Sequence, residues 1–185
     1  MNYLFGGYDW LNKYFIVEEK KVELSFTGER ISSDGGFLLL REVENQLGLV
    51  NSISNCITDD RDQRYIDHTI EEMLTQRVFQ IAAGYEDCND SNDLREDMIL
   101  KTCVGRLPQS GNELASQPTI SRLENSIGKK ELYKIGKQLV GSFVQSYAQA
   151  PKVIILDCDD TNNNTYGQQE LNLFNHYYNE HCYMP

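Results

Sequence analysis

Between residues 22 and 150, apolar side chains recur at spacings of three and four positions, the period of an amphipathic helix. The clearest stretch is residues 70–83. Thr69 and Glu72 stand at the spacing of a capping box before the apolar stripe, and Gly84 follows its last position. The pattern predicts a well-defined helix here.

Further stretches predict a mostly helical region. Residues 37–49 form an amphipathic helix, with Gly48 as its stop signal. Its packing stripe is expected to consist of Leu39, Leu40, Val43 and Leu47. Additional helices are predicted over residues 93–104, 119–127 and about 130–147.

The two ends of the chain have a different pattern. Residues 1–21 show no sustained periodicity and predict a leader that need not be ordered. Residues 22–26 alternate like a short strand, and residues 27–36 have the composition of a loop. Residues 153–156 are a β-branched apolar run, which predicts a buried central strand.

This pattern divides the chain into a leader, a helical region over residues 22–150 and a third region over residues 151–185. The last region begins with a strand and therefore reads as the start of an α/β domain. The fold class expected from periodicity is a mostly α region followed by that first strand.

Composition narrows the class of protein. With 185 residues and 40% hydrophobic composition, the chain is long enough for one ordinary core. The longest apolar runs are far shorter than the ~20 residues of a membrane helix, and no signal peptide pattern is present, so we expect a cytoplasmic protein. The 5 scattered cysteines predict reduced thiols.

Carboxylates follow the predicted strand. Asp157 and Asp159 would share one strand face, whereas Asp160 would face away. Two neighbouring carboxylates on one face suit a divalent cation, with Mg²⁺ or Mn²⁺ as the natural choice. An ordinary solvated turn, rich in Asp and Asn, explains the same residues equally well.

A phosphatase motif is a second chemical interpretation. Asp157, Asp159 and Thr161 match the D-x-D-x-T pattern of haloacid-dehalogenase-like phosphatases, in which the first Asp is the nucleophile. Those enzymes build most of their fold after the motif. Too few residues follow Thr161 here for that fold.

Several short sequence motifs, in the same order along the chain, resemble those of bacterial insertion-sequence transposases of the DDE class. Upstream they are SDGGFLLLRE at 33–42, QR at 76–77, GYEDCND at 84–90 and LASQPTISRLEN at 114–125. Downstream they are DCDDT at 157–161, YGQQE at 166–170, FNHYY at 174–178 and CYMP at 182–185. The resemblance covers about residues 26–185 and is far more specific than one short motif.

The resemblance implies a ribonuclease-H-like catalytic domain, of which residues 151–185 would be the truncated start. In that family a first-strand Asp, a later Asp and a Glu hold two metal ions for DNA strand cleavage and transfer. Asp159 is the expected first acid, with Asp157 as the alternative. The other two acids are expected beyond Pro185, so the chain by itself should be inactive and should not hold Mg²⁺ or Mn²⁺ tightly.

The resemblance also implies DNA as a partner, at the inverted-repeat ends of a transposon, and full-length transposase as another. Residues 114–127 resemble the second half of a helix-turn-helix, introduced by Ser116 and Pro118. The residues expected at DNA are Gln117, Thr119, Ser121, Arg122, Lys129 and Lys130. An ordinary capped helix that packs Ile120 and Leu123 inward is the competing interpretation.

The charge of the chain bears on the prediction that it binds DNA. The net charge of -11 opposes phosphate binding, but acidic residues concentrate over residues 57–97, whereas residues 129–137 are locally basic. Arg61, Arg64 and Arg77 are expected to form surface ion pairs with nearby aspartates. Three hypotheses follow, in this order: a defective transposase fragment, a DNA-binding regulator derived from one, and a phosphatase.

Overall fold

The computed structural model describes residues 14–17, 19–23, 34–159 and 161–184. It divides into two compact units, Met1–Ser146 and Tyr147–Pro185, which are described separately. The described elements of the first unit are β1 (Tyr14–Val17), β2 (Lys20–Glu23), α1 (Phe37–Leu47), α2 (Leu49–Ser54), the short 3-10 helix η1 (Gln63–Tyr65), α3 (Ile70–Ala82), α4 (Asp90–Asp93), α5 (Met98–Val104), α6 (Gln117–Ser126) and α7 (Lys129–Gln145). Those of the second unit are β3 (Asn163–Asn164), β4 (Leu173–Asn175) and β5 (Glu180–Tyr183).

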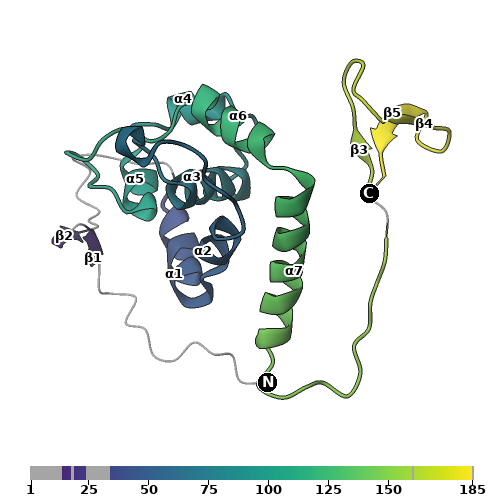
Figure 1. Ribbon diagram of the computed structural model, residues 1–185, viewed down its shortest axis with the longest axis horizontal. Coiled ribbons are helices and arrows are strands. Elements are labelled where there is room, and N and C mark those ends of the chain that lie inside the picture. The colour runs from purple at the N-terminus through teal and green to yellow at the C-terminus, as the bar shows by residue number, and fades with distance from the viewer. Residues whose placement is uncertain (1–13, 18, 24–33, 160, 185) are drawn as a thin grey trace. The chain divides into compact units, whose positions relative to one another are not determined.

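Helix α3 is central to the first unit, because it contacts α2, α4, α5 and α6 (Figure 1). Its predicted capping box is confirmed: Thr69 Oγ1 accepts from the Glu72 N–H at 3.1 Å, and Glu72 Oε2 accepts from the Thr69 N–H at 2.7 Å. Local hydrogen bonds therefore fix where this helix begins.

Two apolar clusters make the core of the first unit. One joins α1, α3 and α5 with the loop before α6, and its buried members are Phe37, Leu38, Phe79, Leu94, Leu100, Cys103 and Leu114. The other joins α3 to α6, and its buried members are Met73, Ala115, Ile120 and Leu123. Helix α6 is thus attached to the core through α3.

The packing stripe predicted for α1 is confirmed at Leu40, which is half-buried against the core, and wrong at its other three positions. The helix buries Phe37 and Leu38, whereas Leu39, Val43 and Leu47 are 53%, 49% and 68% exposed. The buried residues lie in the first turn, which adjoins α5, so the later turns of α1 contribute little to the core. Gly48 does end the helix as predicted, in the left-handed conformation with φ 59°.

The helix predicted over residues 93–104 is shorter, because only residues 98–104, as α5, and the last residue of α4 are helical. Helix α4 ends at Asp93 and α5 begins at Met98. Asp97 caps α5, since its side chain accepts the Leu100 N–H at 2.7 Å. This cap sets the start of α5, which four residues separate from the end of α4.

The chain before α1 contains a hairpin within part of the predicted leader. Strands β1 and β2 pair antiparallel, with Val17 opposite Lys20. The strand predicted over residues 22–26 overlaps β2, and the rest of that prediction lies outside the described residues. Residues 1–13 also lie outside them.

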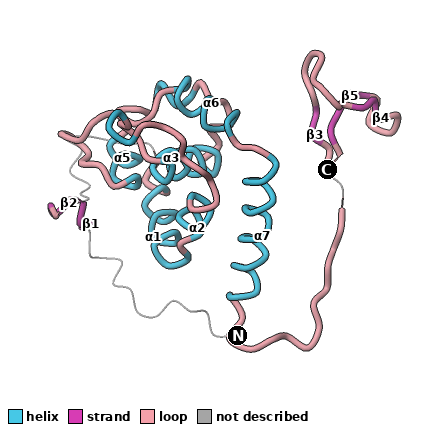
Figure 2. Tube along the Cα trace, viewed as in Figure 1, coloured by secondary structure: helices cyan, strands magenta, loops and turns pink. Residues whose placement is uncertain are grey.

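The second unit is a small antiparallel sheet in the order β3, β5, β4. Residues 153–156 lie outside this sheet and outside every other described strand, and Figure 2 shows them as loop. Val153, Ile154, Ile155 and Leu156 are 75%, 52%, 89% and 81% exposed. The prediction of a buried strand there is wrong, because no described neighbour supplies the hydrogen bonds and contacts of a central strand.

The cysteines differ in accessibility, which predicts their reactivity. Burial raises the pKa of the Cys103 thiol to about 12, so at pH 8 it is almost wholly protonated and unreactive. Cys182 is also buried, whereas Cys158 is exposed. We expect brief treatment with iodoacetamide to modify Cys158 first, and mass spectrometry of tryptic peptides measures this. Equal rates for Cys103 and Cys158 would contradict the packing described here.

Candidate functional site

Helix α6 has a buried face and an exposed face. Ile120 and Leu123 are 0% and 5% exposed and lie in the cluster shared with α3. Pro118, Arg122 and Asn125 are exposed. The packing of Ile120 and Leu123 agrees with an ordinary capped helix and still leaves a polar face open to a ligand.

The residues predicted to contact DNA do not share one exposed surface. Arg122 is exposed on α6, and Lys129 and Lys130 are exposed at the start of α7. Gln117 and Ser121 are half-buried, and the Gln117 N–H donates to Asn92 Oδ1 at 3.0 Å.

Thr119 is half-buried as well, and its hydroxyl lies 3.1 Å from that of Ser116. Ser116 is the N-cap residue of α6, as predicted, but its side chain forms no hydrogen bond to the backbone of the first turn. Of the six residues predicted to contact DNA, the exposed ones are therefore Arg122, Lys129 and Lys130.

The arrangement around α6 is not a helix-turn-helix. That motif joins two helices by a turn of about three or four residues. Here α5 ends at Val104, and the long loop of residues 105–116 separates it from α6. Helix α6 packs instead on α3 and α4, so the predicted resemblance to a second helix-turn-helix element is wrong.

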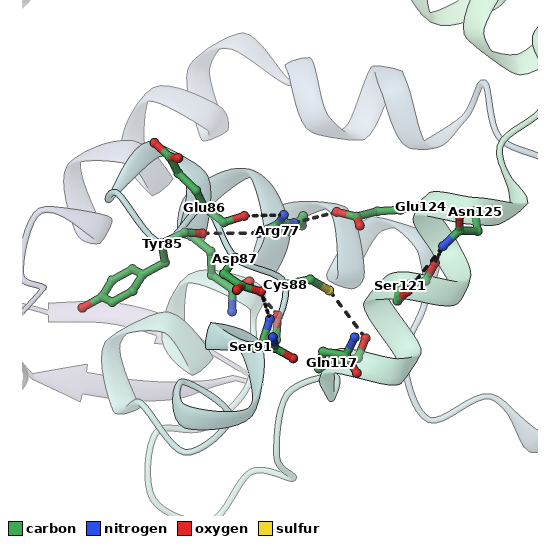
Figure 3. Close-up of polar contacts among 12 residues, drawn as sticks. Arg77, Tyr85, Glu86, Asp87, Cys88, Ser91, Gln117, Ser121, Glu124 and Asn125 are labelled. Carbon is green, nitrogen blue, oxygen red and sulfur yellow. Dashed lines mark hydrogen bonds and ion pairs between the residues drawn. The ribbon is translucent and has the colours of Figure 1, made fainter. Parts of the chain in front are cut away.

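Polar side chains of α3 hold α6 in place together with residues 84–92, a loop that continues into α4 and is called here the loop of residues 84–92. We call Gln76, Arg77 and Gln80 the α3 polar face. Gln76 Nε2 donates to the Ala115 carbonyl, and the Ala115 N–H donates to Gln76 Oε1, both at 2.9 Å. Figure 3 shows Arg77 between the loop and α6, within reach of Glu86 and Glu124.

The predicted catalytic acids lie in the second unit. Asp157 and Asp159 are exposed on the segment that precedes β3, and Asp160 lies outside the described residues. In the part of the chain that the structure describes, no three His, Cys, Asp or Glu side chains are arranged to hold a metal ion. Two exposed carboxylates do not supply the six or so oxygen ligands of a Mg²⁺ site, so these residues do not by themselves fit a metal centre.

The family profile described as Transposase DDE domain group 1 matches residues 15–185. The chain belongs to this family. Its DDE transposase domain implies a ribonuclease-H-like fold, dependence on divalent metals and DNA as a partner. A search of curated proteins and a search of solved structures each found no match.

Two residues of the α3 polar face, Gln76 and Arg77, form one of the sequence motifs that resemble DDE transposases. The side chains of QR at 76–77 form hydrogen bonds to GYEDCND at 84–90 and to LASQPTISRLEN at 114–125. Three motifs that are separate in the sequence are thus in contact in this DDE transposase chain. The shared pattern was a signal for this contact, but it did not show which atoms meet.

The ion pairs predicted for three arginines have two outcomes. Arg61 pairs with Asp59 at 2.7 Å and Arg64 pairs with Asp62 at 2.6 Å, as predicted. The hydrogen bond from Arg61 lowers the pKa of the Asp59 carboxyl from 3.8 to about 2. Arg77 pairs with Glu124 of α6 and not with those aspartates, so that part of the prediction is wrong.

A hollow of about 520 Å³ lies beside the first turn of α6. Its lining mixes cationic, acidic and neutral side chains: Arg61, Asp62, Tyr65, Ile66, Asp67, His68, Arg95, Ser116 and Thr119. Burial, with Arg106 nearby, lowers the pKa of His68, which favours its neutral form. The charges in the lining largely balance, so the hollow does not form a strongly positive site for phosphate.

No helix among the described residues is long and apolar enough to cross a membrane. The helix nearest to the necessary length is α7, at 17 residues, and it carries four lysines. The prediction of no membrane partner was also based on the shortness of the apolar runs in the sequence.

Proposed function

We propose that this DDE transposase chain contributes to DNA transposition by binding the inverted-repeat ends of its element through α6 and the start of α7. The observation that carries the proposal is the exposed Arg122 on α6, followed closely along the chain by exposed Lys129 and Lys130. Arginine reads guanine edges and lysine contacts phosphate, so these residue types suit the two kinds of DNA contact.

The net charge of -11 does not by itself oppose this proposal. Exposed charges more than about 10 Å apart are largely screened at ordinary salt, so the local surface matters more than the total. Glu124, the acid on α6, forms an ion pair with Arg77. Its charge is therefore partly neutralised beside Arg122.

Binding of the purified chain to a duplex carrying the inverted-repeat end tests this proposal. We expect it to exceed binding to a scrambled duplex. The Arg122→Ala variant should weaken binding to the repeat about tenfold, the effect of losing one base contact. Lys129→Ala should weaken binding to both duplexes and lower the salt slope by about one. Equal affinity of the unaltered chain for the two duplexes would refute sequence recognition by this chain.

For the acids, we propose that Asp159, or Asp157 as the alternative, is the first catalytic acid of the family's site. The supporting observation is the DCDDT motif at residues 157–161, which lies within the region that the family profile matches. Among the described residues no three side chains are arranged to hold a metal ion, so we infer that this chain by itself binds Mn²⁺ weakly and does not cleave DNA. Calorimetric titration with Mn²⁺ checks this. Tight binding that survives both Asp157→Asn and Asp159→Asn would contradict the assignment.

A DNA-binding regulator is the second candidate. It is favoured by the location of α6, Lys129 and Lys130 in the first unit, which has its own apolar core and does not include Asp157 or Asp159. Such a chain would occupy transposon ends and compete with full-length transposase. We expect Asp159→Asn to leave end binding unchanged. The phosphatase alternative predicts hydrolysis of p-nitrophenyl phosphate, and we expect none.

A further inference from the structure

Helix α6 is joined to α3 by directional polar contacts as well as by apolar packing. Gln76 is 1% exposed and uses both ends of its amide on the backbone of Ala115, two residues before α6 begins. Apolar packing is not directional, but two hydrogen bonds to the backbone of one residue, on its N–H and on its carbonyl, define a single position. Gln76 thus fixes where the chain enters α6.

Arg77 makes the corresponding contacts near the far end of α6. Its Nε donates to Glu124 Oε1 at 2.7 Å, its Nη2 donates to the Glu86 carbonyl at 2.9 Å and its Nη1 donates to the Tyr85 carbonyl at 3.3 Å. The side chain is 13% exposed. A planar guanidinium with three acceptors has little freedom to rotate, so Glu124 is held at a defined place.

The loop of residues 84–92 is bonded to both helices. Ser91 Oγ donates to Gln80 Oε1 of α3 at 3.0 Å, and both residues are 0% exposed. Asn92 Oδ1 accepts the first N–H of α6, from Gln117. The α3 polar face and this loop therefore contact α6 before its start, at its start and near its end.

These contacts determine which way Arg122 faces. Residues two apart on an α-helix lie about 200° apart around its axis. Since Arg77 holds Glu124 toward α3, Arg122 is turned toward solvent, where it is exposed. A rotation of α6 that broke the contact with Arg77 would also move Arg122.

We propose that Arg77 and Gln76 are positioning residues for DNA recognition, which set the rotation of α6 so that Arg122 reaches the base edges. Arg77 itself does not touch DNA in this arrangement, because its nitrogens are occupied by Glu124 and two backbone carbonyls. The inference rests on the proposed function, in which α6 binds the transposon end.

The Glu124→Gln variant gives a test in which electrostatics and positioning predict opposite signs. Removing a carboxylate makes the chain less negative, so electrostatics alone predicts tighter binding to any duplex. Loss of positioning predicts weaker binding to the inverted-repeat end, by about tenfold, with unchanged or slightly tighter binding to the scrambled duplex. Tighter binding to both duplexes would overturn the proposal.

Arg77→Lys separates a positioning role from a phosphate contact. The variant keeps the positive charge but loses the fork that reaches three acceptors. We expect the same loss of preference for the repeat as in Glu124→Gln. Retained preference would overturn the proposal. Matched controls are Arg64→Lys and Asp62→Asn, which alter an exposed ion pair between two residues outside α3 and α6.

Amide hydrogen exchange provides a readout that does not depend on DNA. In Arg77→Lys we expect faster exchange in α6 and in the loop of residues 84–92, while the protected amides of α3 keep their rates. If the unaltered chain shows no preference for the repeat but α6 still loosens, the proposed DNA function fails, and the structural contact stands without a role in recognition. Unchanged exchange in α6 would overturn the positioning proposal itself.

Discussion

Replacing Arg106 with methionine is expected to lower the free energy of unfolding by about 3 kcal/mol, the low end of the range for breaking a buried ion pair. Arg106 is 8% exposed. Its Nε donates to Glu72 Oε1 at 3.0 Å, and its other nitrogens donate to the carbonyls of Asp67 and Glu113. The substitution leaves all three acceptors unpaired. Urea denaturation followed by circular dichroism at pH 7 measures the change.

The pH dependence of this contribution follows from Glu72. Burial alone would raise the pKa of Glu72, but the hydrogen bonds from Arg106 and from the Thr69 backbone hold it below its ordinary value of 4.5. A carboxyl with a depressed pKa stabilises the fold above the ordinary value, and the contribution is lost as the pH falls through the lowered value. The difference in stability between the unaltered chain and the variant should therefore shrink below pH 4.5.

Arg64→Met is the matched control for this substitution. The Arg64 side chain is 79% exposed and pairs with Asp62, which is itself 46% exposed. Water and salt screen exposed pairs of this kind, so we expect little change. Equal losses in the two variants would mean that the contacts of Arg106 do not stabilise the fold.

The Ile120→Ala variant is expected to lose about 3 kcal/mol of stability, as other large-to-small core substitutions do. Ile120 is 0% exposed and belongs to the cluster that attaches α6 to α3. The cavity left by the missing side-chain atoms would weaken the packing of α6 on α3, so binding to the inverted-repeat end should weaken as well. Thermal denaturation and a binding titration at a temperature well below the midpoint measure the two effects.

Arg122→Ala is the complementary variant, because it lies two residues away on the exposed face. We expect its stability to change by less than about 0.5 kcal/mol, while repeat binding falls. A stability loss in Arg122→Ala as large as that in Ile120→Ala would mean that α6 does not have the buried and exposed faces described above.

Helices with local signals were predicted well from the sequence. The capping box of Thr69 and Glu72 involves residues three apart, and the stop at Gly48 depends on one backbone conformation. The strand expected over residues 153–156 was wrong because a strand requires a partner, which a local pattern cannot provide. Burial was predicted wrongly at Leu39, Val43 and Leu47 of α1 for the same reason, since a neighbour decides which turn of a helix is covered.

The candidate site was predicted only in part. Exposure of Arg122, Lys129 and Lys130 follows from their charge, and the apolar face of α6 follows from helical period. The partner of Arg77 did not follow, because Glu124 lies 47 positions away and closer aspartates were available. A contact of that kind depends on how α3 and α6 pack.

The exposed run from Val153 to Leu156 has a further consequence, for solution behaviour. Consecutive β-branched apolar residues without charge are the kind of segment that joins other chains in intermolecular β-structure. Lys152 and Asp157 flank the run directly and place opposite charges at its two ends. Charged neighbours of this kind act as gatekeepers against aggregation. We therefore expect Asp157→Asn to make the chain more prone to fibrillar association.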